Sequence, residues 1–295
     1  MNSNKQVKSN KSQRPLKPMA WLLLSLIISS CSEDVITIDL NDAEPKIVIE
    51  GTLSDLGEPC TVAISKSGDF YKPSVFPPVR GATVTLQDSE GNRETLAENE
   101  PGLYRGGSLT GVEGRTYTLT VESDGNRYDA VSTLMEAVEI DSLTYYFEDD
   151  PEIFNDDYED VEEGYVFSCH FTDPETADNY YRFKLTHNGK LFQDYFMFQD
   201  RYYGDGEDIE YDFSNWFIFE KNDTMKVELL SIDKAAFDYF FTLSAVLLSE
   251  NSGPVFSSVP DNPLTNFTGG ALGYFAAYSV RSQTVVFEES ATGAQ

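Results

Sequence analysis

The residue types that most often carry enzyme chemistry are sparse in this chain of 295 residues. It has two histidines, His170 and His187, and neither has a partner at metal-ligand spacing. Ser231-Ile-Asp-Lys234 matches the SxxK pattern of a serine nucleophile, but the companion motifs are absent and a helix cap is the better interpretation of Ser231. The 50 acidic residues offer many carboxylate pairs, and no spacing singles one out. The sequence therefore indicates no catalytic residue.

The clearest chemical signal is a cysteine that follows a leader-like segment. Residues 1–30 contain five basic residues, no acidic residue and a short apolar run, a pattern typical of a secretory signal and too short to span a bilayer. The adjoining Ile28-Ser29-Ser30-Cys31 resembles the lipobox, in which small side chains precede a cysteine that becomes lipidated. We predict that residues 1–30 are a lipoprotein signal peptide and that Cys31 attaches the chain to a membrane. The alternative is an ordinary cleaved signal with an incidental cysteine.

The residues after Cys31 predict the membrane surface on which the protein works. Ser32, Glu33 and Asp34 look like a short acidic signal that directs lipoproteins to the cell-surface face of the outer membrane, and residues 31–44 form an acidic tether. The leader holds five of the 21 basic residues and none of the 50 acidic ones, so its removal changes the net charge from −29 to about −34. That charge repels nucleic acid and anionic lipid, so membrane contact should depend on the lipid anchor.

A glycine-bearing acidic loop is the one candidate metal site. Asp205, Glu207 and Asp208 lie within residues 204–210, and oxygen-rich loops of this kind suit calcium. The loop lacks the twelve-residue EF-hand spacing, and a solvated acidic loop explains the same residues. Apart from calcium, the sequence implies no cofactor.

Aromatic residues flank this loop and form a candidate site for an unknown extracellular ligand or a partner. They are Tyr202, Tyr203, Tyr211 and Trp216. Rings on a loop rim can stack on a sugar or dock another protein. The alternative is that most of these rings fill a β core.

Four more residues bear on modification and oxidation. Ser142 and Thr224 lie in the tripeptides Asp-Ser-Leu and Asp-Thr-Met, which resemble a short O-glycosylation sequon of bacterial envelopes. Cys60 and Cys169 are far apart in sequence, and either a disulfide or two buried thiols fits their spacing.

The first half of the mature chain predicts a small β domain over residues 45–138. Apolar residues alternate with polar ones in several short segments, which is typical of strands with one buried side. Turn residues such as Asp124 and Gly125 separate the segments. We expect an antiparallel sandwich of immunoglobulin or transthyretin type.

Residues 139–295 predict a second, aromatic-rich antiparallel β domain, because 32 of the 39 aromatic residues follow residue 141. Asn188-Gly189 predicts a two-residue hairpin turn. Residues 231–248 predict one packed helix, with Ser231 as the cap and Asp233 in the first turn. Two final strands are expected near residues 269–280 and 284–288. The fold class is therefore all-β with one helix.

Several segments together resemble a bacterial outer-membrane lipoprotein family, the domain of unknown function DUF4249. They are Lys46–Gly51, Pro77–Val84, Pro101–Tyr104, Gly114–Leu119, Asn179–Phe183 and Gly269–Phe275. The resemblance covers nearly the whole mature chain. It implies an envelope lipoprotein encoded near TonB-dependent transporters, implies no reaction or catalytic residue, and leaves Cys60 and Cys169 unexplained.

The function that these observations favour is non-catalytic. We expect a surface-exposed outer-membrane lipoprotein that binds a ligand, or serves as an accessory component of a TonB-dependent uptake system. The alternatives are a structural adhesin or spacer, and a carboxylate-dependent surface hydrolase.

Overall fold

A computed structural model describes residues 45–68, 76–149, 163–176, 178–192, 196–199, 205–251 and 262–288, with the backbone alone for 248–251. All of them belong to one compact unit. The predicted signal peptide, the tether, Cys31 and the acidic signal of Ser32, Glu33 and Asp34 lie outside the described residues. Within the described part, no helix is long and apolar enough to cross a membrane.

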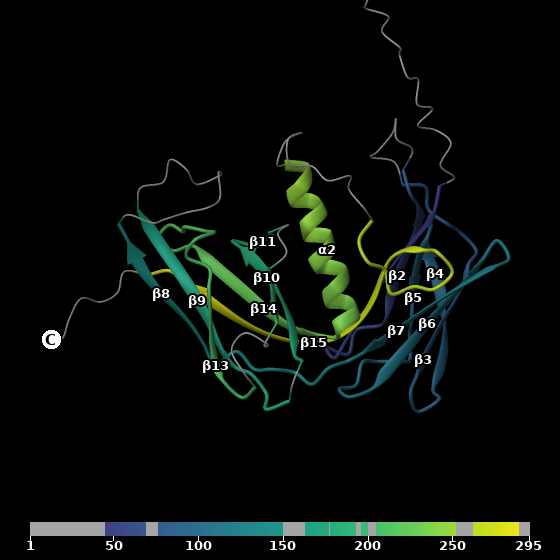
Figure 1. The fold of residues 1–295 in the computed structure, drawn as a ribbon, viewed down its shortest axis with the longest axis horizontal. Coiled ribbons are helices and arrows are strands. Elements are labelled where there is room, and N and C mark those ends of the chain that lie inside the picture. The colour runs from purple at the N-terminus through teal and green to yellow at the C-terminus, as the bar shows by residue number, and fades with distance from the viewer. Residues whose placement is uncertain are drawn as a thin grey trace, which may run out of the picture. The chain divides into compact units, whose positions relative to one another are not determined.

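The regular elements of the described chain are β-strands and one helix, so the predicted fold class is confirmed (Figure 1). The strands before residue 140 are β1 (Ile47–Ser54), β2 (Thr61–Lys66), β3 (Thr83–Asp88), β4 (Arg93–Glu100), β5 (Leu103–Arg105), β6 (Thr116–Ser123) and β7 (Asn126–Thr133). The later elements are β8 (Ser142–Glu148), β9 (Gly164–Thr172), β10 (Tyr180–His187), β11 (Lys190–Leu191), β12 (Phe196–Gln199), β13 (Asp208–Asp212), β14 (Thr224–Ile232), α2 (Lys234–Asn251) and β15 (Leu272–Val286).

These strands form two sheets. The larger runs in the order β11-β10-β14-β15-β1-β2-β5-β4-β3-β6-β7, with β12 also paired to β10. The smaller has the order β13-β9-β8. Among the described strand pairs, β1 with β15 is parallel and the others are antiparallel. The predicted hairpin at Asn188-Gly189 is confirmed, because both residues have positive φ and join β10 to β11.

The last strand, β15, differs from the prediction because it is one strand of 15 residues rather than two. Its first half, to Tyr278, pairs with β1, and its second half, from Ser279, pairs with β14. Gly273 allows the close pairing with β1, since its φ is 92° and a Cβ there would collide with the Ile49 carbonyl oxygen. The strand thus reaches both sides of the predicted domain boundary after residue 138, and that boundary stays a prediction.

Arg281 ties the second half of β15 to the segments beside it. Its guanidinium forms ion pairs with Asp55 at 2.6 Å, Glu139 at 2.6 Å and Glu113 at 3.1 Å. Three carboxylates around this cation raise the pKa of Arg281, and the hydrogen bond that Arg281 donates to Asp55 is the largest cause. Segments far apart in sequence are therefore joined where β15 changes its partner.

Two large buried clusters fill most of the fold, and a smaller third cluster lies under α2. The sandwich core lies among the strands before residue 140 and is mostly aliphatic, with Phe267 and Phe275 added from the end of the chain. The aromatic core lies between the smaller sheet and strands β10, β12 and β14, and about half of its buried members are Phe. The buried rings of the aromatic core meet mainly edge to face or tilted. In the Phe171–Phe198 pair, for example, the ring centroids are 5.8 Å apart and the interplanar angle is 90°.

Helix α2 packs over the outer face of β10, β14 and β15, where Phe237 and Ala236 meet a third buried cluster. The predicted cap was wrong. Ser231 is a buried residue of β14, and Asp233 caps the helix by accepting a hydrogen bond from the Ala236 N–H at 2.9 Å. The other carboxylate oxygen of Asp233 accepts from the Thr133 N–H of β7 at 2.8 Å, so this cap also anchors the helix start.

Candidate ligand-binding groove

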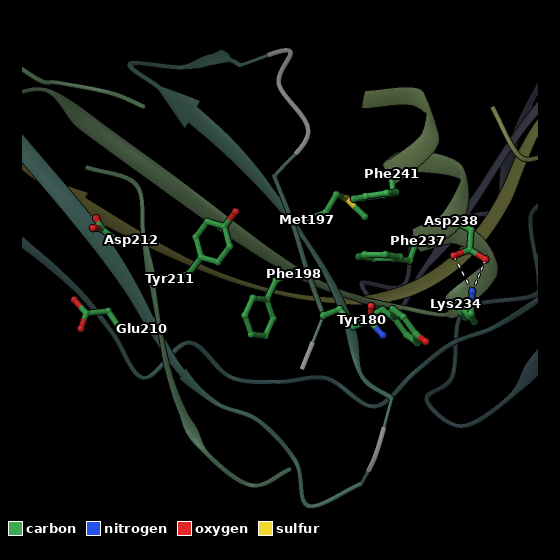
Figure 2. Close-up of a pocket in the computed structure, with 11 residues that line it drawn as sticks. Tyr180, Met197, Phe198, Glu210, Tyr211, Asp212, Lys234, Phe237, Asp238 and Phe241 are labelled. Atoms are coloured by element: carbon green, nitrogen blue, oxygen red, sulfur yellow. Dashed lines mark hydrogen bonds and ion pairs between the residues drawn. The ribbon is translucent and has the colours of Figure 1, made fainter. Parts of the chain in front are cut away.

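A groove of about 670 Å³ lies between β12, β13 and the first turns of α2 (Figure 2). Six of its eleven lining residues are aromatic or otherwise apolar, and the other five are polar or charged. The lining residues are Tyr180, Met197, Phe198, Gln199, Glu210, Tyr211, Asp212, Lys234, Phe237, Asp238 and Phe241.

The strand side of the groove is an extension of the aromatic core. Tyr211 projects from β13 toward the groove, and its ring contacts those of Phe183 at 4.5 Å and Phe198 at 6.0 Å. Side chains alternate along a strand, so Glu210 and Asp212 point to the opposite side of β13, as Figure 2 shows. On this strand the ring of Tyr211 therefore faces the groove, and the carboxylates of the lining residues Glu210 and Asp212 point away from that ring.

The helix side presents two rings one turn apart. Phe237 and Phe241 stack at 5.7 Å with an interplanar angle of 11°. Phe237 is buried against Tyr180 at 5.0 Å, whereas Phe241 is 56% exposed. Tyr180, Phe198 and Phe237 thus form a buried floor, and Phe241 stands at the mouth.

The cation among the lining residues is already paired. The Lys234 ammonium contacts both carboxylate oxygens of Asp238, at 2.8 and 2.6 Å, and this hydrogen bonding raises the lysine pKa. An anionic ligand would have to displace Asp238 to reach this charge. The groove is consequently suited to a ligand with apolar faces and no anionic group.

The family model for the domain of unknown function DUF4249 matches residues 33–284. The chain belongs to this family. No curated protein matches the chain. The sequence resemblance is thereby confirmed, while the function expected from it stays a prediction.

The structure brings one of the four predicted ring residues of this DUF4249 member into the groove. Tyr211 lines it, whereas Trp216 lies outside it, 41% exposed and 5.7 Å from the ring of Phe196. Tyr202 and Tyr203 lie outside the described residues. Tyr180 and Phe237 were not predicted at the site, because their period-two and helical spacings look like those of ordinary core residues.

The three predicted calcium ligands do not converge. Asp205 lies in a turn, Glu207 follows it, and Asp208 begins β13 and accepts a hydrogen bond from the Thr172 hydroxyl at 3.1 Å. In the described ranges no group of three or more His, Cys, Asp or Glu side chains could hold a metal ion. Calcium binding stays a prediction to which this geometry adds no support.

Neither histidine lines the groove. Of the SxxK motif, Lys234 lines it and Ser231 does not. His187 contacts Asp223 at 2.9 Å, and His170 contacts the Thr144 hydroxyl at 2.7 Å. Ser231 is buried in β14, and Lys234 is held by Asp238. These contacts indicate structural roles for both histidines, Ser231 and Lys234.

Both thiols and both sequon residues are placed by the structure. Cys60 and Cys169 are free and buried in the sandwich core and the aromatic core, and burial raises the pKa of each to about 12. Thiols of this kind are chemically inert at neutral pH. Ser142 is exposed at the start of β8 and Thr224 is half-buried at the start of β14, and their glycosylation stays a prediction.

Proposed function

We propose that this protein is a lipid-anchored lipoprotein on the outer-membrane surface that binds a small organic ligand in the aromatic groove. In this proposal it performs no chemistry and serves as an accessory component of a TonB-dependent uptake system. The Cys31 motif supports the anchor, and the family resemblance supports the transporter as partner.

The observation that carries the proposal is the groove. Its volume of about 670 Å³ falls within the range of roughly 300–1,000 Å³ that is common for small-molecule sites. Such sites combine apolar and aromatic walls with a few polar groups that orient the ligand. Here the polar residues beside the rings are Gln199, Glu210, Asp212 and the paired Lys234 and Asp238.

The charge around the groove narrows the ligand class. The carboxylates of Glu210 and Asp212 point away from the ring of Tyr211, and Asp238 neutralises Lys234. The chain as a whole carries a net charge of −29. We therefore expect an uncharged ligand with apolar faces, and we expect phosphorylated or carboxylated compounds to be rejected.

The anchor and the partner are tested together. The native protein should take up labelled palmitate, and gentle solubilisation of the outer membrane should yield it with one recurrent TonB-dependent transporter. The Cys31→Ala variant should lose the label and leave the membrane fraction. Equal membrane partitioning of the variant and the parent would contradict the proposed anchor, and recovery without any transporter would contradict the proposed partner.

A further inference from the structure

Strand β8 is an open edge of the smaller sheet. It pairs with β9 on one side and with no other described strand. On β9, the backbone N–H and C=O of Tyr165 bond to Phe219, away from β8. Its neighbour Phe147 therefore directs its own N–H and C=O away from β9, and alternation extends this to Tyr145 and Leu143. Within the described chain, these outward backbone groups have no hydrogen-bond partner.

The side chains do little to protect this edge. Natural edge strands are commonly protected by lysine, proline, bulges or a covering segment. Between Ser142 and Phe147 the strand has no charged residue and no proline. Tyr146 is 51% exposed and Phe147 is 52% exposed. An uncharged strand with open backbone groups is the template that an added strand requires.

The surroundings of the edge are acidic. Asp141 and Glu148 flank the uncharged stretch, and Glu210 and Asp212 lie on the outer face of the same sheet. Burial is the largest cause that raises the pKa of Tyr146. The negative charges of Asp212, Glu148 and Glu210 raise it further, because these carboxylates lie near the Tyr146 hydroxyl. A strand added to β8 would therefore be stabilised by positive charge.

A second copy of this chain fits the edge poorly. Antiparallel self-pairing centred on Tyr145, whose backbone groups point outward, would place Asp141 of each copy opposite Asp149 of the other. Each chain also carries a net charge of −29. Like charges directly opposite each other destabilise a strand pair.

We propose that β8 is a docking edge for an extended segment of a partner protein in which basic and apolar residues alternate. One face of such a segment would continue the row of Leu143, Tyr145 and Phe147 beside the aromatic core. Its other face would lie beside Ser142, Thr144, Tyr146 and the outer carboxylates. The site does not depend on the groove.

The test uses the full mature protein and a blocked peptide, Lys-Val-Lys-Val-Lys-Val-Lys, in fluorescence anisotropy. The matched peptide has Glu in place of Lys. Phe147→Pro removes the outward N–H but no bond to β9, and Phe147→Ala removes only the ring. We expect the Lys peptide to bind, the Glu peptide and the Phe147→Pro variant each to lose at least about tenfold in affinity, and Phe147→Ala to lose much less. The groove variant Phe241→Asp should bind the Lys peptide like the parent.

Three results would overturn the inference: no binding of the Lys peptide, equal binding of the two peptides, or equal affinity of Phe147→Pro and Phe147→Ala. Melting curves establish that both variants are folded. If Phe147→Pro does not fold, amide hydrogen exchange of the unaltered protein decides, because the peptide should slow exchange at Leu143, Tyr145 and Phe147. Unchanged exchange at all three amides would reject the docking edge.

Discussion

The sandwich core and the aromatic core solve the same packing problem with different residues. In the sandwich core, buried tyrosines form hydrogen bonds to loop backbone. The Tyr104 hydroxyl donates to the Val79 carbonyl at 3.1 Å and accepts from the Ala82 N–H at 3.0 Å. In the aromatic core the rings contact one another, as in the stacked Phe167–Phe213 pair at 4.7 Å. The first arrangement fastens loops to a sheet, and the second joins two sheets through a network of rings.

The groove is bordered by the aromatic core and not by the sandwich core. The groove lies where the aromatic core ends against α2. In our proposal the sandwich supports the protein above the membrane, and the aromatic half binds the ligand and the partner.

The largest effect should come from the strand that both halves share. In Gly273→Ala the new Cβ would collide with the Ile49 carbonyl oxygen at a φ of 92°, so β15 would separate from β1. We expect a loss of at least about 3 kcal/mol in the free energy of unfolding, measured with urea. Gly270→Ala has a similar φ of 83° but open space around it, and should lose only about 1 kcal/mol. Equal losses would show that the β1–β15 contact is not tight.

A smaller effect should distinguish the two cores directly. Phe167 of the aromatic core has three ring partners, Phe213, Phe219 and Phe287, at 4.7, 5.7 and 6.2 Å. Phe275 is equally buried in the sandwich core, among mostly aliphatic neighbours. We expect Phe167→Leu to destabilise the protein by about 1–3 kcal/mol more than Phe275→Leu, in urea unfolding. The reverse order would contradict the ring network as a source of stability.

The helix that borders the groove gives the next prediction. Asp233→Ala removes the cap and the bond to Thr133, and should lower the free energy of unfolding by about 1–2 kcal/mol. Ser231→Ala removes a hydroxyl inside β14 and should lower it by less. Calorimetric melting of both variants tests the order, and a larger effect at Ser231 would restore the cap expected from the sequence.

The smallest effect is a pH dependence in the sandwich. Hydrogen bonds from the Asn92 side chain first, then from the backbone of Asn92 and Glu90, lower the Asp88 pKa despite partial burial. A carboxyl with a lowered folded pKa stabilises the fold above its unfolded pKa of about 3.9, and this contribution is lost as the pH falls through the folded pKa. The melting temperature of the parent should exceed that of Asp88→Asn at pH 7, and the gap should close below about pH 4. A gap that is constant with pH would be inconsistent with the lowered pKa.

Local patterns were sufficient for much of the fold. Period-two alternation predicted strands, and Asn188-Gly189 predicted a hairpin because both residues tolerate positive φ. The helix was predicted, but its start was placed two residues early, at Ser231 instead of Asp233. Both residues are good caps, and the pairing of Ser231 with Tyr181 on one side and Ser279 on the other keeps the chain extended there.

The parts that could not be predicted depend on partners distant in sequence. No local pattern shows that β15 continues through Ser279 while its neighbour changes from β1 to β14. Tyr211 was predicted at the site because it flanks an acidic loop. Tyr180 and Phe241 were not, because rings at strand and helix spacing are usually core residues.

The central claim is that the groove holds a ligand, and its most direct test compares two exposed phenylalanines. Phe241 at the groove and Phe76 on the sandwich side are 56% and 59% exposed. The lipidated protein, purified from membranes, would be analysed by native mass spectrometry as the parent, Phe241→Asp and Phe76→Asp. We predict a bound small molecule on the parent and on Phe76→Asp, and its loss from Phe241→Asp. A ligand retained by Phe241→Asp, or no ligand on the parent, would contradict the claim.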